Sequence, residues 1–496
     1  MTKRWSLVLG LALSAAPLVA AGPPVKRAAE PEVVMSDVSA RHAERAELHR
    51  SLEARELASG LSRALVVKLT AAEKAAADTQ VNEGRLRVGI EKSVGAVLRL
   101  TGALQFGDFA AQADGTVVWS GRVASPGASA LRLHLSPFDL PESAELFVYA
   151  ADGQAYGPYT GRGPIDDGQL WTNTILGDEV RLQLRVAPQD VANTRLVVAD
   201  VGHLGAAFPM ATSAFCADNA ACVVNAGCVN VSAVTDARDA VAHILFASGG
   251  SYWICTGGLI ADSDASSVVP YFLTANHCLS TASEASSLET YFDYQTTCSS
   301  PNCGAPYGNP RQPDTLGAQV VKTSSTSDYT LMRLSSAPAT DDGVVRYLGW
   351  NSTAVANSNG AALHRISHPQ GSPQAYSAHT VDTSKPTCRS WPRGNWIYSR
   401  DTEGATEGGS SGSPVVNGAG QIVGQLSGGC GFNVGDNCDA ASNATVDGAF
   451  AAYFSQVSPF LAGGGSSCSA AGASCTANSQ CCSANCKGKP GAKSCK

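Results

Sequence analysis

Three short segments of this sequence carry side chains that could together perform acyl transfer. The first is Gly408-Gly409-Ser410-Ser411-Gly412-Ser413-Pro414, which places Ser411 in a glycine-rich loop. A serine hydroxyl becomes a useful nucleophile only when a base removes its proton and two donors stabilise the oxyanion. The glycines let the backbone turn tightly, so the N–H groups of Gly409 and Ser411 can point together at a carbonyl oxygen. Taken alone, this segment is also compatible with an ordinary Gly/Ser-rich turn.

The second segment supplies a candidate base. Residues 271–278 read YFLTANHC, an apolar strand that delivers His277 at its end with Cys278 directly after it. A neighbouring strand pattern, WICTGGLI, carries Cys255. We expect a Cys255–Cys278 disulfide that holds the histidine strand against its neighbour and fixes the position of the imidazole. The other eight histidines lack such a setting and are expected to be surface or packing residues.

The third segment supplies a carboxylate. Asp328 directly precedes the alternating pattern YTLMRL, so it stands at the start of a predicted strand. A carboxylate there can accept a hydrogen bond from the far nitrogen of the histidine ring and fix its tautomer. An isolated Asp before a strand is more often a turn residue. The order His277, Asp328, Ser411 along the chain favours a shared catalytic role over separate roles as packing, turn and loop residues.

These segments resemble a known family. The motifs TANHC, SDYTLMRL and TEGGSSGSPVV are similar to those of the trypsin-like serine peptidases, most of all the bacterial lysyl endopeptidase group, over roughly residues 210–462. The resemblance implies an all-β catalytic domain of two six-stranded antiparallel β-barrels with the active site between them. It implies Ser411 as nucleophile, His277 as general base and Asp328 as the orienting carboxylate, with an oxyanion hole from Gly409 and Ser411. The implied function is a secreted serine endopeptidase that acts on proteins or peptides without a cofactor or metal.

Two positions depart from the family pattern. Animal trypsins carry an Asp before the nucleophile that pairs with the freed N-terminus, whereas this chain has Ser410. Lysyl endopeptidases carry an Asp near the base of the S1 pocket, and alignment of the segment DGAF places Thr445 there. A threonine cannot neutralise a buried ammonium group, so the sequence argues against a strict lysine preference at P1. Asp447, on the same face of the predicted strand, could supply the missing charge or be an exposed strand-end acid. Three further residues are expected to form the pocket wall that pairs with the substrate backbone: Leu426, Ser427 and Gly428.

The elements that must position these residues divide the chain into distinct stretches. Residues 1–21 have a basic start, an apolar run and small residues at the end, which is typical of a secretory signal peptide. Residues 22–85 are rich in Ala, Glu, Arg and Leu and favour helices. Residues 86–207 alternate in short runs such as TVVWSGRV and VRLQLRV, which predicts a β-sandwich. We interpret this stretch as a pro-domain that assists folding and blocks the active site until cleavage near residues 200–215; an ordinary accessory domain is the alternative.

The remaining stretches are the catalytic domain, residues 208–462, a Gly/Ser linker at 463–467, and a disulfide-rich module at 468–496. The spacing of the six cysteines in this module resembles the inhibitor-cystine-knot family. Its four lysines and lack of acids suggest docking onto an anionic surface such as a cell wall, and a protease-resistant cap without a partner is the alternative.

Composition limits the other classes of function. The chain has 496 residues, of which 44% are hydrophobic and 16% charged, so it can bury a sizeable core. The net charge of −7 and the absence of a basic stripe argue against nucleic acid as a partner, and no apolar run after the signal is long enough for a membrane span. A non-catalytic binding or adhesion protein on a protease fold remains the alternative to the enzyme.

All 16 cysteines lie at or after Cys216, and an even number in an exported chain predicts disulfides. The lysyl endopeptidase resemblance implies Cys216–Cys438 and Cys222–Cys298. The four cysteines that depart from that pattern are paired as Cys228–Cys303 and Cys388–Cys430, although sequence alone does not fix connectivity. For the C-terminal module, the cystine-knot resemblance implies Cys468–Cys482, Cys475–Cys486 and Cys481–Cys495.

Overall fold

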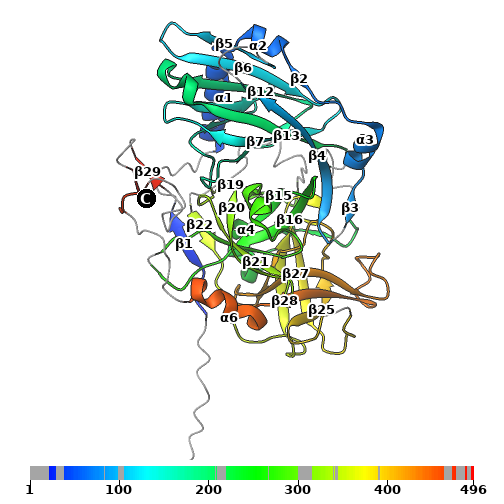
Figure 1. Cartoon of the computed structure of the whole chain (residues 1–496). Helices are drawn as coiled ribbons and strands as arrows, with labels where there is room; N and C mark the ends of the chain where they lie inside the picture. Colours follow the sequence, from blue (N-terminus) through cyan, green and yellow to red (C-terminus); the bar gives the residue numbers. More distant parts are fainter. Residues whose placement is uncertain are drawn as a thin grey trace, which may run out of the picture.

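The computed structural model is mostly β-sheet and contains two large bodies, shown in Figure 1. The residues that it describes are listed here: 22–29, 38–82, 84–98, 105–206, 208, 219–265, 267–299, 315–338, 340, 344–388, 391–462, 472–475, 486–488 and 493–495. The predicted signal peptide and the linker lie outside these residues.

The first body is a β-sandwich of two sheets, as the alternating sequence pattern predicts. One sheet contains β2 (Leu65–Val66), β6 (Val117–Ala124), β12 (Glu179–Val186), β8 (Glu145–Tyr149) and β9 (Ala155–Tyr159), with β5 (Asp108–Ala111) beside β6. The other contains β10 (Leu170–Trp171), β7 (Ala130–Asp139), β13 (Arg195–Leu204) and β4 (Leu86–Val97), with β11 (Ile175–Leu176) and β3 (Val81–Asn82) at its margins. The inward faces share one apolar core that includes Trp119, Leu133 and Val198.

The stretch before the sandwich is helical only in part. It forms α1 (Val38–Glu53), α2 (Ala58–Ser62) and α3 (Ala71–Asp78), and Thr70 and Glu73 make a capping box at the start of α3. Residues 26–29 instead form strand β1, which pairs with β22 (Val344–Tyr347) of the second body. Pro23 and Pro24 lack backbone N–H groups and disfavour a helix, so the chain that follows them can lie extended against the edge of a sheet.

The second body consists of two β-barrels and confirms the predicted catalytic fold. In the first barrel, β15 (Val241–Ser248), β16 (Ser251–Leu259), β17 (Tyr271–Thr274), β21 (Tyr329–Leu334) and β20 (Ala318–Ser324) pair in that order, and β18 (Glu289–Tyr291) and β19 (Thr315–Leu316) extend from β15. The ring of pairings among the described strands is nearly closed.

The second barrel closes fully. Its ring runs β24 (Ala375–Val381), β23 (Ala362–Ser367), β26 (Pro414–Asn417), β27 (Ile422–Gly431), β28 (Asn443–Ala449) and β25 (Trp396–Glu403), and β25 pairs again with β24. Strand β14 (Val224–Asn225) adds to β24. Among the described residues, the helices of this body are α4 (Thr235–Ala240), α5 (Ala282–Ser286) and α6 (Phe450–Leu461), with short 3₁₀ turns at 226–228, 232–234 and 369–371; a further 3₁₀ turn at 188–193 joins β12 to β13 in the sandwich.

Strand β4 joins the two bodies. It pairs with β13 of the sandwich along one edge and with β16 of the first barrel along the other, which makes one continuous 13-stranded sheet. Figure 1 shows β4 descending from the sandwich toward β16, with β3 beside it. The amino-terminal sandwich is therefore bound to the barrels by backbone hydrogen bonds as well as by side-chain packing.

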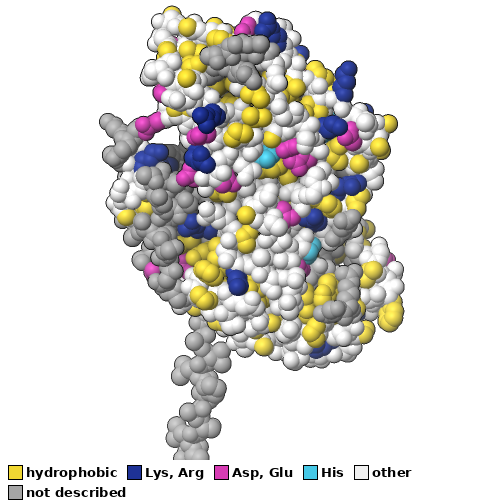
Figure 2. All heavy atoms as spheres, in the orientation of Figure 1, with side chains coloured by type: hydrophobic (Ala, Val, Ile, Leu, Met, Phe, Trp, Pro, Cys, Tyr) yellow, Lys and Arg dark blue, Asp and Glu magenta, His cyan; other side chains and the backbone are white. Residues whose placement is uncertain are grey.

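The described part of the C-terminal module is small. Strands β29 (Cys486–Lys487) and β30 (Ser494–Cys495) pair, and a disulfide joins Cys475 to Cys486. Among the described residues, none of the helices has the length and apolar composition that crossing a membrane requires. On the face shown in Figure 2, the Lys and Arg side chains stand in small separate groups among Asp and Glu rather than in a continuous basic surface.

Candidate active site

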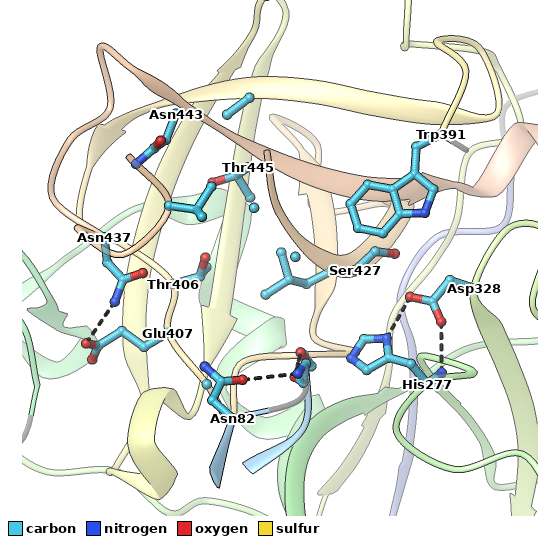
Figure 3. Close-up of a pocket in the computed structure, with 18 of the residues that line it drawn as sticks. Asn82, His277, Asp328, Trp391, Thr406, Glu407, Ser427, Asn437, Asn443 and Thr445 are labelled. Atoms are coloured by element: carbon cyan, nitrogen blue, oxygen red, sulfur yellow. Dashed lines mark hydrogen bonds and ion pairs between the residues drawn. The ribbon is translucent and has the colours of Figure 1, made fainter. Parts of the chain in front are cut away.

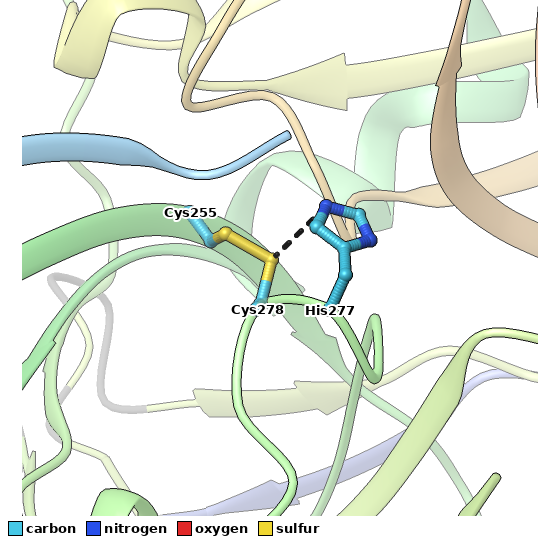
Figure 4. A group of neighbouring side chains, drawn as sticks. All are labelled: Cys255, His277 and Cys278. Atoms are coloured by element: carbon cyan, nitrogen blue, oxygen red, sulfur yellow. Dashed lines mark hydrogen bonds between the residues drawn. A yellow bond between two sulfur atoms is a disulfide. The ribbon is translucent and has the colours of Figure 1, made fainter. Parts of the chain in front are cut away.

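His277 follows strand β17 and is held from two sides. The Cys255–Cys278 disulfide links the residue after it to strand β16 (Figure 4). The side chain of Asp328 binds it twice: Oδ1 accepts the backbone N–H of His277 at 2.8 Å, and Oδ2 lies 2.8 Å from its ring Nδ1. Because a carboxylate only accepts, the proton resides on Nδ1 and leaves Nε2 as the basic nitrogen.

The backbone of Asp328 is itself fixed. Its φ of +51° is in the left-handed region, which Asp tolerates better than most residues. The side-chain amide of Gln425 donates to the carbonyl oxygens of Ser327 and Asp328, both at 3.0 Å, and Tyr453 donates to the Gln425 carbonyl. Asp328 is therefore positioned by hydrogen bonds to the neighbouring barrel.

The loop that carries Ser411 needs its glycines. Gly412 has φ +81°, and a Cβ there would lie 2.1 Å from Oγ1 of Thr274. Gly409 has φ +94°, and its carbonyl accepts from Thr256 Oγ1 at 2.7 Å. Within the described residues, the N–H groups of Gly409 and Ser411 have no acceptor, which leaves both available to an oxyanion.

The position before the nucleophile is neutral and buried. Ser410 has no exposed surface, and its hydroxyl oxygen accepts hydrogen bonds from Ser367 Oγ at 3.1 Å and from the N–H of Glu407 at 3.3 Å. The ion pair that an Asp at this position would make with a freed N-terminus cannot form here.

The Ser411 hydroxyl donates to the carbonyl oxygen of Gly84, not to His277. Gly84 follows strand β3 and has φ +87°, and a Cβ on it would lie 3.0 Å from Cδ2 and 3.2 Å from Nε2 of His277. Figure 3 shows Asn82, from the same turn, to the left of His277, and the Asn82 side chain accepts the N–H of Gly84 at 3.1 Å. A turn of the sandwich therefore occupies the space between the candidate nucleophile and the candidate base. This turn is not among the sequence-predicted site residues, although its Asn-Glu-Gly composition between two strand patterns indicates a turn.

One open cavity of about 710 Å³ contains all three candidate catalytic side chains. Its walls come from both barrels and from the sandwich turn (Figure 3). The residues that line it include Gly84, His277, Asp328, Trp391, Trp396, Asp401, Glu407, Ser411, Leu426, Ser427, Gly428, Asp439 and Thr445. The structure thus brings together His277, Asp328, Ser411 and four of the five predicted pocket residues.

Asp447 is the fifth predicted pocket residue, and the structure places it elsewhere. Its side chain is fully buried behind the cavity, where Oδ1 lies 2.5 Å from Nη2 of Arg365. Neither earlier interpretation of Asp447 is correct, because it is neither an exposed strand-end acid nor part of the cavity wall. The buried guanidinium already compensates its charge.

Asp401 on strand β25 lines the cavity instead, and it is not among the sequence-predicted site residues. Its Oδ1 accepts from Thr445 Oγ1 at 2.6 Å and lies 2.7 Å from Nδ1 of His379. The sequence signal for Asp401 was weak, because it is simply an acid ten positions before Ser411. Its strand, β25, pairs with β28, which carries Thr445, and this pairing is known only from the closed barrel.

The structure corrects several predicted disulfides. It contains Cys255–Cys278 and Cys388–Cys430 as predicted, but it pairs Cys222 with Cys438 and Cys228 with Cys298. The predicted pairs Cys216–Cys438, Cys222–Cys298 and Cys228–Cys303 are therefore wrong. The reason is local: Asn225 binds Thr296 and the carbonyl of Thr297, which sets Cys228 beside Cys298.

Cys216 and Cys303 lie outside the described residues, as do Cys468, Cys481 and Cys482 of the predicted pairs Cys468–Cys482 and Cys481–Cys495. The sulfur atoms of Cys255 and Cys278 approach His277, with Sγ of Cys278 3.9 Å from Nε2. Because these two sulfurs are bonded to each other, they cannot serve as thiolate ligands for a metal ion.

Comparisons with known proteins agree with this geometry. Two family models match the chain: "Lysyl endopeptidase N-terminal domain" over residues 61–205 and "Lysyl endopeptidase, C-terminal domain" over residues 212–447. A lysyl endopeptidase of Pseudomonas aeruginosa is 29% identical over 354 residues, which cover 67% of this chain and 72% of that protein. A secreted RxLR effector protein of Plasmopara viticola is 32% identical over 189 residues, 36% of this chain and 42% of that protein.

Solved structures are more distant. The active form of the Rv3671c protease from M. tuberculosis has a TM-score of 0.32 and 15% identity, covering 55% of this chain and 99% of that one. A serine endoprotease from Yersinia pestis has a TM-score of 0.31 and 16% identity, covering 47% and 67%. These scores are too low to support an argument about function. The two family models together match most of the chain, and it belongs to the lysyl endopeptidase-related peptidases.

Proposed function

We propose that this chain is the precursor of a secreted serine endopeptidase that cleaves peptide bonds through an acyl-enzyme on Ser411. The observation that carries the proposal is the arrangement of His277, whose Nδ1 faces Asp328 and whose Nε2 faces the cavity that contains Ser411. Membership of a serine peptidase family supports the same reaction.

The reaction follows from these positions once the sandwich turn has left the cavity. Nε2 of His277 takes the Ser411 proton as Oγ attacks the carbonyl carbon of the substrate. The N–H groups of Gly409 and Ser411 donate to the oxyanion, and His277 then returns the proton to the leaving amine. Water, deprotonated by the same imidazole, releases the acyl group from Ser411. Asp328 keeps the ring in the required tautomer throughout.

The precursor is proposed to be held inactive by its own sandwich. Residues 22–207 are assigned as the propeptide and residues 208–462 as the catalytic domain, with cleavage between 200 and 215. The support is the turn at Gly84, whose carbonyl accepts the Ser411 proton that His277 would otherwise receive. A substrate carbonyl cannot reach Ser411 while Gly84 remains there.

The same sandwich is proposed to assist folding of the barrels. Glu289 in the first barrel is fully buried, and residues of the sandwich bind it: the N–H and hydroxyl of Thr174 at 2.9 and 2.6 Å, and Arg132 Nε at 3.5 Å. A buried carboxylate without such partners is strongly destabilising. The barrels alone would therefore expose or leave unpaired a charge that the sandwich satisfies.

We further propose that the chain is exported and that its C-terminal module binds a surface outside the cell. The predicted signal at residues 1–21 and the disulfides of the catalytic domain support secretion into an oxidising compartment. For the C-terminal module, an anionic surface such as a cell wall remains the proposed partner because its lysines are not balanced by acids.

Substitution of the nucleophile tests the reaction. Ser411→Ala should abolish turnover of protein substrates to within background, because no hydroxyl remains to form the acyl-enzyme. In the wild-type mature enzyme, a sulfonyl fluoride should add to Ser411, detected by mass spectrometry of the labelled peptide. A folded Ser411→Ala variant that still cleaves casein at a comparable rate would refute the mechanism. A wild-type protein that neither cleaves nor becomes labelled would favour a binding or adhesion protein instead.

A further inference from the structure

Residues 22–29, here called the amino-terminal strap, lie on the second body, and none of them lines the cavity that contains Ser411. The end of the strap is strand β1, which pairs antiparallel with β22. Among the described strands, β22 pairs with β1 alone. Without the strap, this edge of β22 would present unpaired backbone groups, and such an edge accepts an extended peptide.

One side chain of the strap enters a binding site for an ammonium group. Nζ of Lys26 lies 2.7 Å from Oδ1 of Asp262. The same nitrogen donates to the carbonyl oxygen of Asp264 at 2.7 Å, and it lies 3.0 Å from the carbonyl oxygen and 3.3 Å from the hydroxyl of Ser267. A lysine has three donors, so these oxygens satisfy all of them. The side chains of Lys26 and Asp262 are 13% and 8% exposed, so the ion pair is largely shielded from water.

The barrel itself orients the carboxylate of Asp262. Its Oδ2 accepts the hydroxyl of Ser267, and its Oδ1 also accepts the N–H of Asp264 at 2.9 Å. Both donors are neutral, so they fix the carboxylate and leave its charge. Among the described residues, Lys26 is the cation that pairs with it. The segment 262–267 thus holds a fixed negative charge that the strap neutralises.

The surface of the barrels also accommodates the backbone of the strap. A Cβ on Gly349 would lie 2.2 Å from the carbonyl oxygen of Pro23, so a side chain at this position would displace the strap. Val25 and Ala28 pack against the apolar core of the barrels. Strand pairing, apolar contact and a shielded ion pair therefore come together along one short segment.

The second basic residue of the strap lies in a different setting. Arg27 reaches Asp236 at 2.6 Å, but its side chain is 57% exposed. An exposed ion pair contributes little to binding, because water screens it and both side chains lose freedom. Lys26 is therefore the charged residue on which binding of the strap depends.

The sandwich and the strap contact the barrels at two separate places. The sandwich does so through the pairing of β4 with β16 and through the turn at Gly84, and the strap does so at β22. Figure 1 shows β1 and β22 on one side of the barrels and β3 on the other. Because both contacts belong to one chain, release of one leaves the other bound, and rebinding is intramolecular.

We propose that β22, Asp262 and Gly349 form a docking site for an extended peptide with a lysine, and that residues 22–29 occupy it as a second anchor of the propeptide. This anchor keeps the propeptide on the catalytic domain after cleavage between residues 200 and 215. The inference rests on the proposed processing of the precursor. Cleavage there breaks the covalent link after the sandwich and leaves the strap in place.

The lifetime of the cut complex tests the anchor. A full-length Ser411→Ala chain with a recognition sequence for a site-specific protease inserted between residues 207 and 208 can be cut without self-digestion. The two chains should elute together after cutting, and native mass spectrometry after dilution gives the rate at which the propeptide leaves. Lys26→Met keeps a side chain of similar length without the charge. It should raise this rate at least about tenfold, because the strap would then cover an unpaired carboxylate.

Arg27→Met is the matched control, because it removes the neighbouring, exposed cation from the same strand. It should change the rate by no more than about twofold. The inference is overturned if Lys26→Met changes the rate no more than Arg27→Met does, or if the chains separate as soon as they are cut. The measurement needs no catalysis. Failure of the peptidase function would appear elsewhere, as a wild-type protein that neither cleaves casein nor becomes labelled at Ser411.

A competing peptide covers the case in which Lys26→Met fails to fold. The peptide Gly-Pro-Pro-Val-Lys-Arg-Ala-Ala repeats residues 22–29 and should occupy the docking site whenever the strap opens. In excess it should shorten the lifetime of the cut Ser411→Ala complex at least about threefold. The same peptide with norleucine in place of lysine should leave the lifetime unchanged. Equal effects of the two peptides, or no effect of either, would overturn the assignment.

Discussion

At the scale of single residues, the site depends on which atom receives the Ser411 proton. His277 has the correct tautomer because both oxygens of Asp328 are fixed beside it. In the structure, the Ser411 hydroxyl donates to the carbonyl of Gly84. Under the proposed function, the candidate catalytic groups are thus assembled before activation, and activation changes the acceptor of this one hydrogen bond.

Asp328→Asn tests the tautomer argument. An asparagine that keeps the bond to the backbone N–H of His277 would present its NH₂ group to Nδ1, so the ring would take the tautomer with its proton on Nε2. We expect kcat of the mature enzyme to fall on the order of thousands-fold with little change in the thermal unfolding midpoint. Steady-state kinetics and calorimetry measure the two. A loss below about tenfold would show that Asp328 does not orient the base.

At the scale of elements, the β3–β4 hairpin has two separate tasks. Its tip places Gly84 in the active site, and its second strand, β4, joins the sandwich to β16 of the first barrel. Gly84 is suited to the tip because its positive φ and its contact with the His277 ring exclude a side chain.

Gly84→Val should therefore weaken the block in the intact precursor. The valine would meet the imidazole and adopt an unfavourable φ, which costs about 1–2 kcal/mol and corresponds to roughly a tenfold shift toward an open site. Mass spectrometry of the uncleaved precursor should show sulfonyl fluoride labelling of Ser411 about tenfold faster than in wild type. The matched control is Gly95→Val, because Gly95, in strand β4 of the same hairpin, also has positive φ but no atom within 4 Å of its Cβ position. Equal labelling of both variants would argue against the block.

At the scale of the whole molecule, the sandwich and the barrels share one sheet, and the buried ion pair between Arg132 and Glu289 also joins them. Strand β4 carries Glu91, whose N–H donates to the carbonyl of Gly250 in the β15–β16 turn at 2.9 Å. Burial, then the charge of Asp200 and a hydrogen bond to it, raise the pKa of Glu91 to about 7. His134 on β7 is the third titratable group of this cluster. A carboxyl group whose pKa is raised to about 7 thus lies beside the junction of the two bodies.

The precursor should accordingly lose stability as pH rises. The pKa of Glu91 is about 7 in the folded protein and near 4.5 when it is unperturbed, so the folded state holds the proton more tightly. Its contribution is fully present below about pH 4.5 and is lost as pH rises to about 7. Thermal unfolding of the Ser411→Ala precursor between pH 5 and 8 should show this decline, and Glu91→Gln should flatten it. Glu142→Gln, an exposed acid of the same sandwich, should leave the decline intact.

The sequence by itself determined the parts of this protein that are encoded locally. The alternating runs in residues 86–207 predict the sandwich, because successive side chains of a strand point to opposite faces of a sheet. The two barrels were expected from the resemblance of the catalytic motifs to a known family. The catalytic motifs place Ser411 in a glycine-rich loop, His277 after a strand and Asp328 before one. Each motif shows its own strand or turn, so their candidate roles could be assigned without coordinates.

Only the tertiary structure decided which distant groups meet. Asp447 is two residues from Thr445, but its side chain pairs with Arg365, and the acid that binds Thr445 in the cavity is Asp401 on another strand. Cys228 meets Cys298 instead of Cys303, and Gly84 meets Ser411 across more than three hundred residues of chain. These contacts depend on how strands pair across barrels and between bodies. Such pairing is set by packing of the whole core, and no short segment of sequence contains it.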